Sequence, residues 1–134
     1  MSISADGLSR IHKALTTYAA GGRARAVKGV GKVTDKQFAD IKLYYGKKGR
    51  KFKVQDIDVL SKDIVHYYRS KMERDGMDVD EVIFLLKNAF SDESILVPEA
   101  SNRPDRATLV NVSYHGVVNY TEHGSISPIT AIKK

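Results

Sequence analysis

The sequence predicts an α+β protein with three to four helices followed by a small C-terminal antiparallel β-hairpin or sheet. Up to about residue 90, apolar residues recur every three or four positions, as on one face of a helix. Beyond that point, apolar and polar residues alternate as they do in strands. The chain has 134 residues, 42% of them hydrophobic and 28% charged. A single domain over residues 1–134, with a sizeable core, is therefore expected.

The first helix is expected over residues 6–20, where the apolar residues are Leu8, Ile11, Leu15 and Tyr18. Ser4 or Asp6 can cap its N-terminus, and Gly21-Gly22 ends it because glycine readily adopts the left-handed conformation there. Residues 21–33, GGRARAVKGVGKV, hold four glycines and four basic residues without an acid. Such a segment buries too little apolar surface to become ordered, so a flexible basic Gly-rich loop or arm is expected.

The next helix, over residues 34–45, has the strongest local signature in the chain. Thr34 and Gln37 have the spacing of a capping box, and Val33 and Phe38 have that of a hydrophobic staple. Gly46 then opens a basic loop, GKKGRKFK, which extends to residue 53.

Two more helices are expected after this loop. The first covers roughly residues 55–75, with an apolar face formed by Ile57, Leu60, Ile64, Tyr68 and Met72. The second begins at a further capping box, Asp78 with Glu81. Its segment 82–90 is apolar on more than one side, which is typical of a central helix.

The remaining chain is expected to form the sheet. Residues 95–97 predict a short strand, and residues 99–107 a loop. Residues 109–120 alternate between apolar and polar side chains, with His115-Gly116 as the predicted hairpin turn. Residues 121–134 are polar and contain a proline, so they predict an extended tail.

Charge is divided unevenly along the chain, and this division supplies the functional hypothesis. Residues 1–53 hold 13 Lys and Arg against three Asp, whereas residues 54–134 hold nine basic and 13 acidic residues. Phosphate groups of a nucleic acid are the commonest partner of such a basic region. The candidate contacts are nine cations in the two basic segments, namely Arg23, Arg25, Lys28, Lys32, Lys47, Lys48, Arg50, Lys51 and Lys53.

We therefore expect a non-enzymatic nucleic-acid-binding protein with low sequence specificity, and we expect DNA ahead of RNA as its partner. Glycine lets the backbone approach phosphates closely, and lysine and arginine release counterions on contact. The interleaved Tyr44, Tyr45 and Phe52 are candidates for stacking on exposed bases. Neither a cofactor nor a metal is expected.

Three alternatives remain open on the residues alone. The first is a helix-turn-helix over residues 34–65, although Asp56, Asp58 and Asp63 would repel phosphates at its second helix. The second is a structural or assembly protein, for example of a virus or phage particle, which forms homo-oligomers through residues 108–134 because an isolated hairpin is marginally stable. The third is a small enzyme.

Composition excludes several other classes. The chain has no cysteine, so disulfides and cysteine-ligated metals are absent. No apolar stretch approaches the roughly 18 residues of a membrane-spanning helix. The start of the chain, MSISADGLSRIHK, lacks the pattern of a signal peptide. We therefore expect a protein that acts in the cytoplasm or within a virus particle, without a membrane partner.

Overall fold

The computed structural model describes residues 2–98, 103 and 105–134. Within them the helices are α1 (Ala5–Ala19), α2 (Asp35–Gly46), α3 (Ser61–Tyr67), its π-helical continuation η1 (Tyr68–Arg74), and α4 (Val79–Ala89). The strands are β1 (Val27–Lys32), β2 (Asp56–Val59), β3 (Ile95–Leu96), β4 (Arg106–Val110), β5 (Tyr114–Tyr120) and β6 (Ile126–Lys133). The α+β class predicted from the sequence is confirmed.

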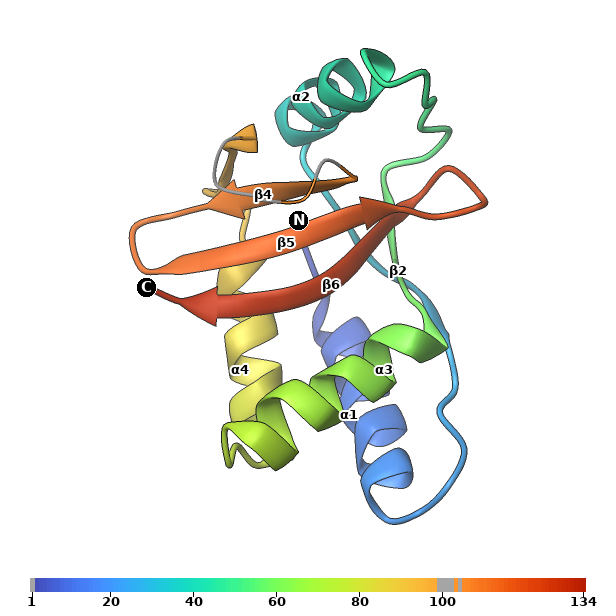
Figure 1. Cartoon of the computed structure of the whole chain (residues 1–134), viewed down its shortest axis with the longest axis vertical. Helices are drawn as coiled ribbons and strands as arrows, with labels where there is room; N and C mark the ends of the chain where they lie inside the picture. Colours follow the sequence, from blue (N-terminus) through green and yellow to red (C-terminus); the bar gives the residue numbers. More distant parts are fainter. Residues whose placement is uncertain (1, 99–102, 104) are drawn as a thin grey trace.

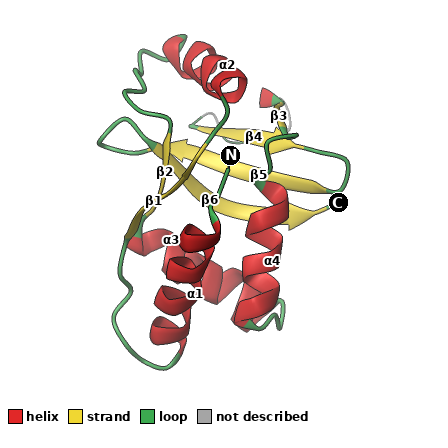
Figure 2. Cartoon of the chain, turned by 180° about the vertical axis from the view of Figure 1, so that it is seen from behind, coloured by secondary structure: helices red, strands yellow, loops and turns green. Residues whose placement is uncertain are grey.

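The six strands form one mixed sheet in the order β1-β2-β6-β5-β4-β3. Strands β2 and β6 run parallel, and every other neighbouring pair is antiparallel. Helices α1, α3 and α4 gather on one side of the sheet, whereas α2 lies at the other end of the long axis (Figures 1 and 2). The expectation of a small C-terminal hairpin after the helices is therefore wrong, because the sheet is larger and strands alternate with helices.

Three predicted helix starts are confirmed by their caps. Ser4 accepts a hydrogen bond from the amide of Gly7 at the start of α1. Complete capping boxes open α2, at Thr34 and Gln37, and α4, at Asp78 and Glu81. No helix in the described residues is long and apolar enough to cross a membrane.

The predicted basic arm over residues 21–33 is only partly a loop, because Val27–Lys32 forms the edge strand β1. Its Gly31 permits a close approach of the N-terminal segment, which forms an isolated bridge from Ile3 to Gly31. A Cβ on Gly31 would lie 1.7 Å from the carbonyl oxygen of Ser2. Glycine therefore supports an ordered contact at this position instead of mobility.

The helix predicted over residues 55–75 begins later than expected. Asp56–Val59 forms strand β2, in which Ile57 and Val59 are buried and alternate with two aspartates. The alternation covers only four residues. Because Leu60 and Ile64 continue the apolar spacing of a helix, the pattern over the whole segment predicted a helix. Because strand β2 separates α2 from α3, the two helices do not form a helix-turn-helix.

The segment predicted as an extended tail, residues 121–134, supplies strand β6 in the middle of the sheet. The two buried serines Ser125 and Ser127 donate to Asp58 at 2.6 Å and to Asp63 at 2.7 Å. Pro128 pairs with Val118 beside an irregularity in the β5 register, where a missing backbone donor is tolerated. These hydrogen bonds allow the serines to be buried. In the sequence, the serines and the proline made the strand resemble a polar tail.

The hairpin turn predicted at His115-Gly116 is also misplaced, since both residues lie in β5. The connection from β4 to β5 is made by residues 111–113, where the Asn111 side chain accepts from the amides of Ser113 and Tyr114. Gly116 instead makes room for the ring of Phe90, which a Cβ would approach to 2.7 Å. Most of the loop predicted over residues 99–107 lies outside the described residues, and its end, Arg106-Ala107, belongs to β4.

Candidate nucleic-acid interface

The nine predicted cations are all exposed, and the structure gathers eight of them in two places. Arg23, Arg25 and Lys28 join two cations of α1, Arg10 and Lys13, around a depression of about 490 Å³. We call this depression the basic groove. Its other lining residues are Ala14, Thr17, Ala26 and Val27, so no carboxylate is present among the residues that line it.

Arg10 attaches the 23–28 segment to α1. Its guanidinium donates to the carbonyl oxygens of Lys28 at 2.8 Å and of Gly29 at 2.9 Å, and to the Asp6 carboxylate at 2.9 Å. The other four cations of the groove form no ion pair or hydrogen bond through their side chains with a described residue. Arg10 therefore positions the groove, and four unpaired cations remain to bind an anion.

The second basic place is the loop of residues 47–53, which carries Lys47, Lys48, Arg50, Lys51 and Lys53. Its backbone is held by the sheet and by α2. The amide of Lys53 donates to Gly124 at 2.8 Å, the amide of Arg50 donates to Tyr45 at 3.0 Å, and the Tyr120 hydroxyl donates to Lys51 at 2.9 Å. Five exposed cations are thus presented on an anchored backbone.

The aromatic residues near this loop are largely unavailable for stacking on bases. Tyr45 and Phe52 are 1% and 7% exposed, because they pack edge to face in the core at a centroid distance of 5.1 Å. Tyr44 is half-buried, and its hydroxyl donates to Arg106 at 2.8 Å. The expectation that these rings contact bases is wrong for Tyr45 and Phe52.

The basic groove and the basic loop lie near opposite ends of the long axis, on the same flank of the molecule in both views (Figures 1 and 2). Strands β1 and β2 connect the two ends. Lys32, the last of the predicted cations, lies on β1 between them, with its ammonium 4.0 Å from Asp56. The candidate interface is therefore an elongated flank.

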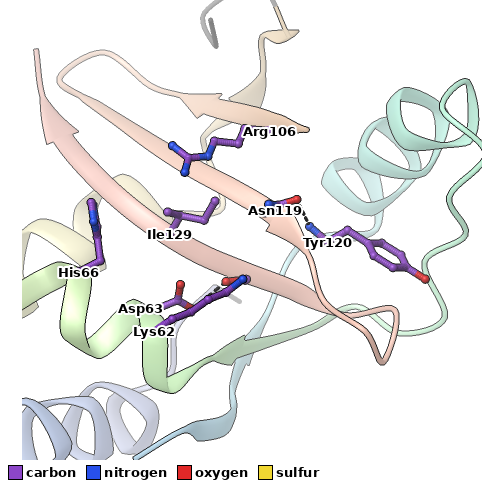
Figure 3. A pocket seen from close by; sticks show the side chains of 8 residues that line it. Lys62, Asp63, His66, Arg106, Asn119, Tyr120 and Ile129 are labelled. Atoms are coloured by element: carbon purple, nitrogen blue, oxygen red, sulfur yellow. Dashed lines mark hydrogen bonds between the residues drawn. The ribbon is translucent and has the colours of Figure 1, made fainter. Parts of the chain in front are cut away.

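A smaller pocket of about 200 Å³ lies between α3 and strands β4, β5 and β6 (Figure 3). It is lined by Lys62, Asp63, His66, Arg106, Asn119, Tyr120, Ser127 and Ile129. Sequence reasoning did not select this group for a site, because its members come from separate segments. The alternation of apolar and polar residues in β2 was the one sequence signal that could have placed a strand beside this pocket.

Asp63 is 2% exposed and is the carboxylate in this pocket. Its Oδ2 accepts from the Leu60 amide at 2.8 Å and from Ser127 at 2.7 Å. Burial raises the pKa of Asp63 above its ordinary value, and these two hydrogen bonds oppose the rise. Burial, with nearby cations, lowers the pKa of His66 one helical turn later.

Replacing Asp63 by asparagine is expected to raise the melting temperature at pH 7 by a few degrees. The amide oxygen can still accept both hydrogen bonds, while the desolvated charge is removed. The raised pKa means that the wild-type protein loses stability as pH rises from 3.8, the ordinary value, through the folded-state pKa. Thermal unfolding from pH 3 to 8 should show this loss in the wild-type protein and a flatter profile in D63N. A lower melting temperature for D63N throughout would contradict this reasoning.

The described residues contain no group of three or more His, Asp or Glu that could hold a metal ion. Asp78 and Glu81 are engaged in the capping box of α4.

Comparisons with protein-family models, with curated proteins and with solved structures found no match for this chain. The function is therefore argued from the charges and geometry of the two basic places and of the pocket.

Proposed function

We propose that this protein binds nucleic acid through the phosphate backbone, without catalysis and with low sequence specificity. DNA is the nucleic acid that we propose ahead of RNA. The cations of the basic groove and of the basic loop neutralise phosphates and release counterions, which supplies most of the binding free energy in such complexes. Contacts of this kind position a protein on nucleic acid but carry no sequence information.

One observation carries the proposal. The basic groove holds four cations without ion-pair partners among the described residues, and no carboxylate lines it. Exposed cations on folded proteins are commonly interspersed with acids, so an acid-free lining indicates an anionic partner. The basic loop adds five exposed cations on the same flank.

Fluorescence anisotropy with labelled duplex DNA, single-stranded DNA and RNA at low ionic strength tests the proposal. We expect binding to all three, with little difference between unrelated sequences. Absence of binding to every probe would refute it.

The basic loop should contribute to binding without contributing to stability. In the variant K47Q/K48Q/R50Q/K51Q, affinity for DNA should fall by at least tenfold at 0.1 M salt, because the phosphate contacts made by the loop are lost. The melting temperature should change little, since these side chains are exposed. Anisotropy and thermal unfolding measure the two effects. A variant that fails to fold would show that the loop has a structural role.

The structure does not favour the assembly alternative. Edge-to-edge pairing through residues 108–134 requires an available strand edge, but β6 is paired with β2 on one side and with β5 on the other. The edges of the sheet are β1 and β3. We therefore make no proposal of assembly through the C-terminal segment.

A further inference from the structure

The Arg106 side chain lies in the small pocket, and no described residue forms a hydrogen bond or an ion pair with it. Its side chain projects from β4 toward the pocket (Figure 3). The Nε atom is buried and has no hydrogen-bond partner, and the guanidinium forms no ion pair with a described residue. An unsatisfied buried donor is unfavourable, and a charged one more so, which points to a bound group that completes it.

The Arg106 backbone is fixed independently of any ligand. Its carbonyl oxygen accepts from the Tyr44 hydroxyl at 2.8 Å, and it pairs with Asn119 across β4 and β5. The guanidinium is therefore presented from a rigid strand. A ligand would meet a donor that is already in place, which lowers the entropy cost of binding.

Two other donors face the same space. Lys62 is exposed at the rim, and the Asn119 amide makes only a long contact of 3.4 Å to Asp105. Asp63 is the opposing charge, but its Oδ2 already accepts two hydrogen bonds. Two cations, Arg106 and Lys62, thus face one carboxylate, which favours binding of an anion with modest affinity.

We propose that this pocket binds a phosphate group, with Arg106 as its main ligand and Lys62 as its second. Arginine matches the geometry of phosphate oxygens through its paired donors. The pocket volume of about 200 Å³ lies below that of pockets for larger ligands. It therefore suits a phosphate group better than a whole nucleotide.

The phosphate is the terminal phosphate of a nucleic-acid strand, and this part of the proposal rests on the proposed function. Lys62 and Tyr120 also line an adjoining depression of about 370 Å³, which extends to Ala26. Ala26 in turn lines the basic groove. A strand held in the groove can therefore follow this depression and place its end beside Arg106.

Nuclear magnetic resonance of the ¹⁵N-labelled protein tests the site. Inorganic phosphate, adenosine monophosphate and an oligonucleotide with a 5′- or 3′-phosphate should each shift the Arg106 Nε–H resonance in a saturable manner. A phosphorylated oligonucleotide should bind at least fivefold more tightly than the same strand with hydroxyl ends. R106Q should abolish this difference, whereas R69Q, which removes a charge outside the pocket, should preserve it.

An Arg106 resonance that is unchanged at saturating phosphate, or an end preference that survives in R106Q, would overturn the proposal. If R106Q does not fold, K62Q at the exposed rim should reduce the end preference, and an unchanged preference would count against the site. Equal affinity for adenosine monophosphate and the phosphorylated strand would support the pocket and refute its link to a strand end. Phosphate binding at Arg106 without any oligonucleotide binding would refute the proposed function and the strand-end assignment that rests on it, and would support the phosphate site.

Discussion

Replacing Lys13, Arg23, Arg25 and Lys28 by glutamine is expected to lower affinity for duplex DNA by about three orders of magnitude at 0.1 M salt. Each lost phosphate contact reduces the salt slope of log K by about 0.9, so four lost contacts reduce it by about 3 to 4. All four side chains belong to the basic groove and lack ion pairs with described residues. Anisotropy titrations across a salt series measure both quantities.

The control variant R69Q/K87Q/K133Q/K134Q removes the same charge from four exposed positions outside the basic groove and the basic loop. It should lose far less affinity, because only the overall charge changes. Equal losses in the two variants would show that binding responds to net charge and not to the groove. Arg10 is left intact in both, since it holds the 23–28 segment to α1.

Removing residues 121–134 is expected to prevent folding. This deletion takes away β6, which joins β2 to β5, so the sheet would separate into two parts. Ile126, Ile129 and Ala131 would leave the core, where all three are buried. Burial of a large apolar side chain contributes roughly 1.5–3 kcal/mol, and total stability is only about 5–15 kcal/mol. Circular dichroism and thermal unfolding of the shortened chain measure the outcome.

Removing only Lys133 and Lys134 is the matched control, because both are exposed at the end of β6. This chain should fold with a small decrease in melting temperature. If the chain without residues 121–134 unfolds cooperatively near the wild-type temperature, the segment is a dispensable tail and the position of β6 is wrong.

The helices could be predicted where their start signals are local. Thr34 with Gln37 and Asp78 with Glu81 are capping boxes within four residues of sequence, and the structure contains both. Nothing outside those residues is needed to form them. The α+β class followed from the change in apolar spacing.

The strands that were not predicted from the sequence, β1, β2 and β6, depend on contacts between distant segments. In the sequence, Gly31 indicated a flexible segment. In the structure, its lack of a side chain allows the backbone of Ser2 to approach closely. Ser125 and Ser127 looked like surface residues, but each is buried against an aspartate from another element. Such pairings become visible only when the partner strand is in place.

The candidate sites could also be predicted only in part from the sequence. The exposure of the basic residues could be anticipated from their acid-free segments, whereas the joining of Arg10 and Lys13 to the groove required the packing of α1. The small pocket combines α3 with β4, β5 and β6, so Lys62 and Arg106 meet only in the folded chain.

The salt dependence of wild-type DNA binding tests the central claim most directly. If about six phosphates are neutralised, log K should fall with log salt at a slope near −5. The same slope should appear with DNA duplexes of unrelated sequence. Absence of binding at low ionic strength, or binding whose affinity does not change with salt, would contradict recognition through the phosphate backbone.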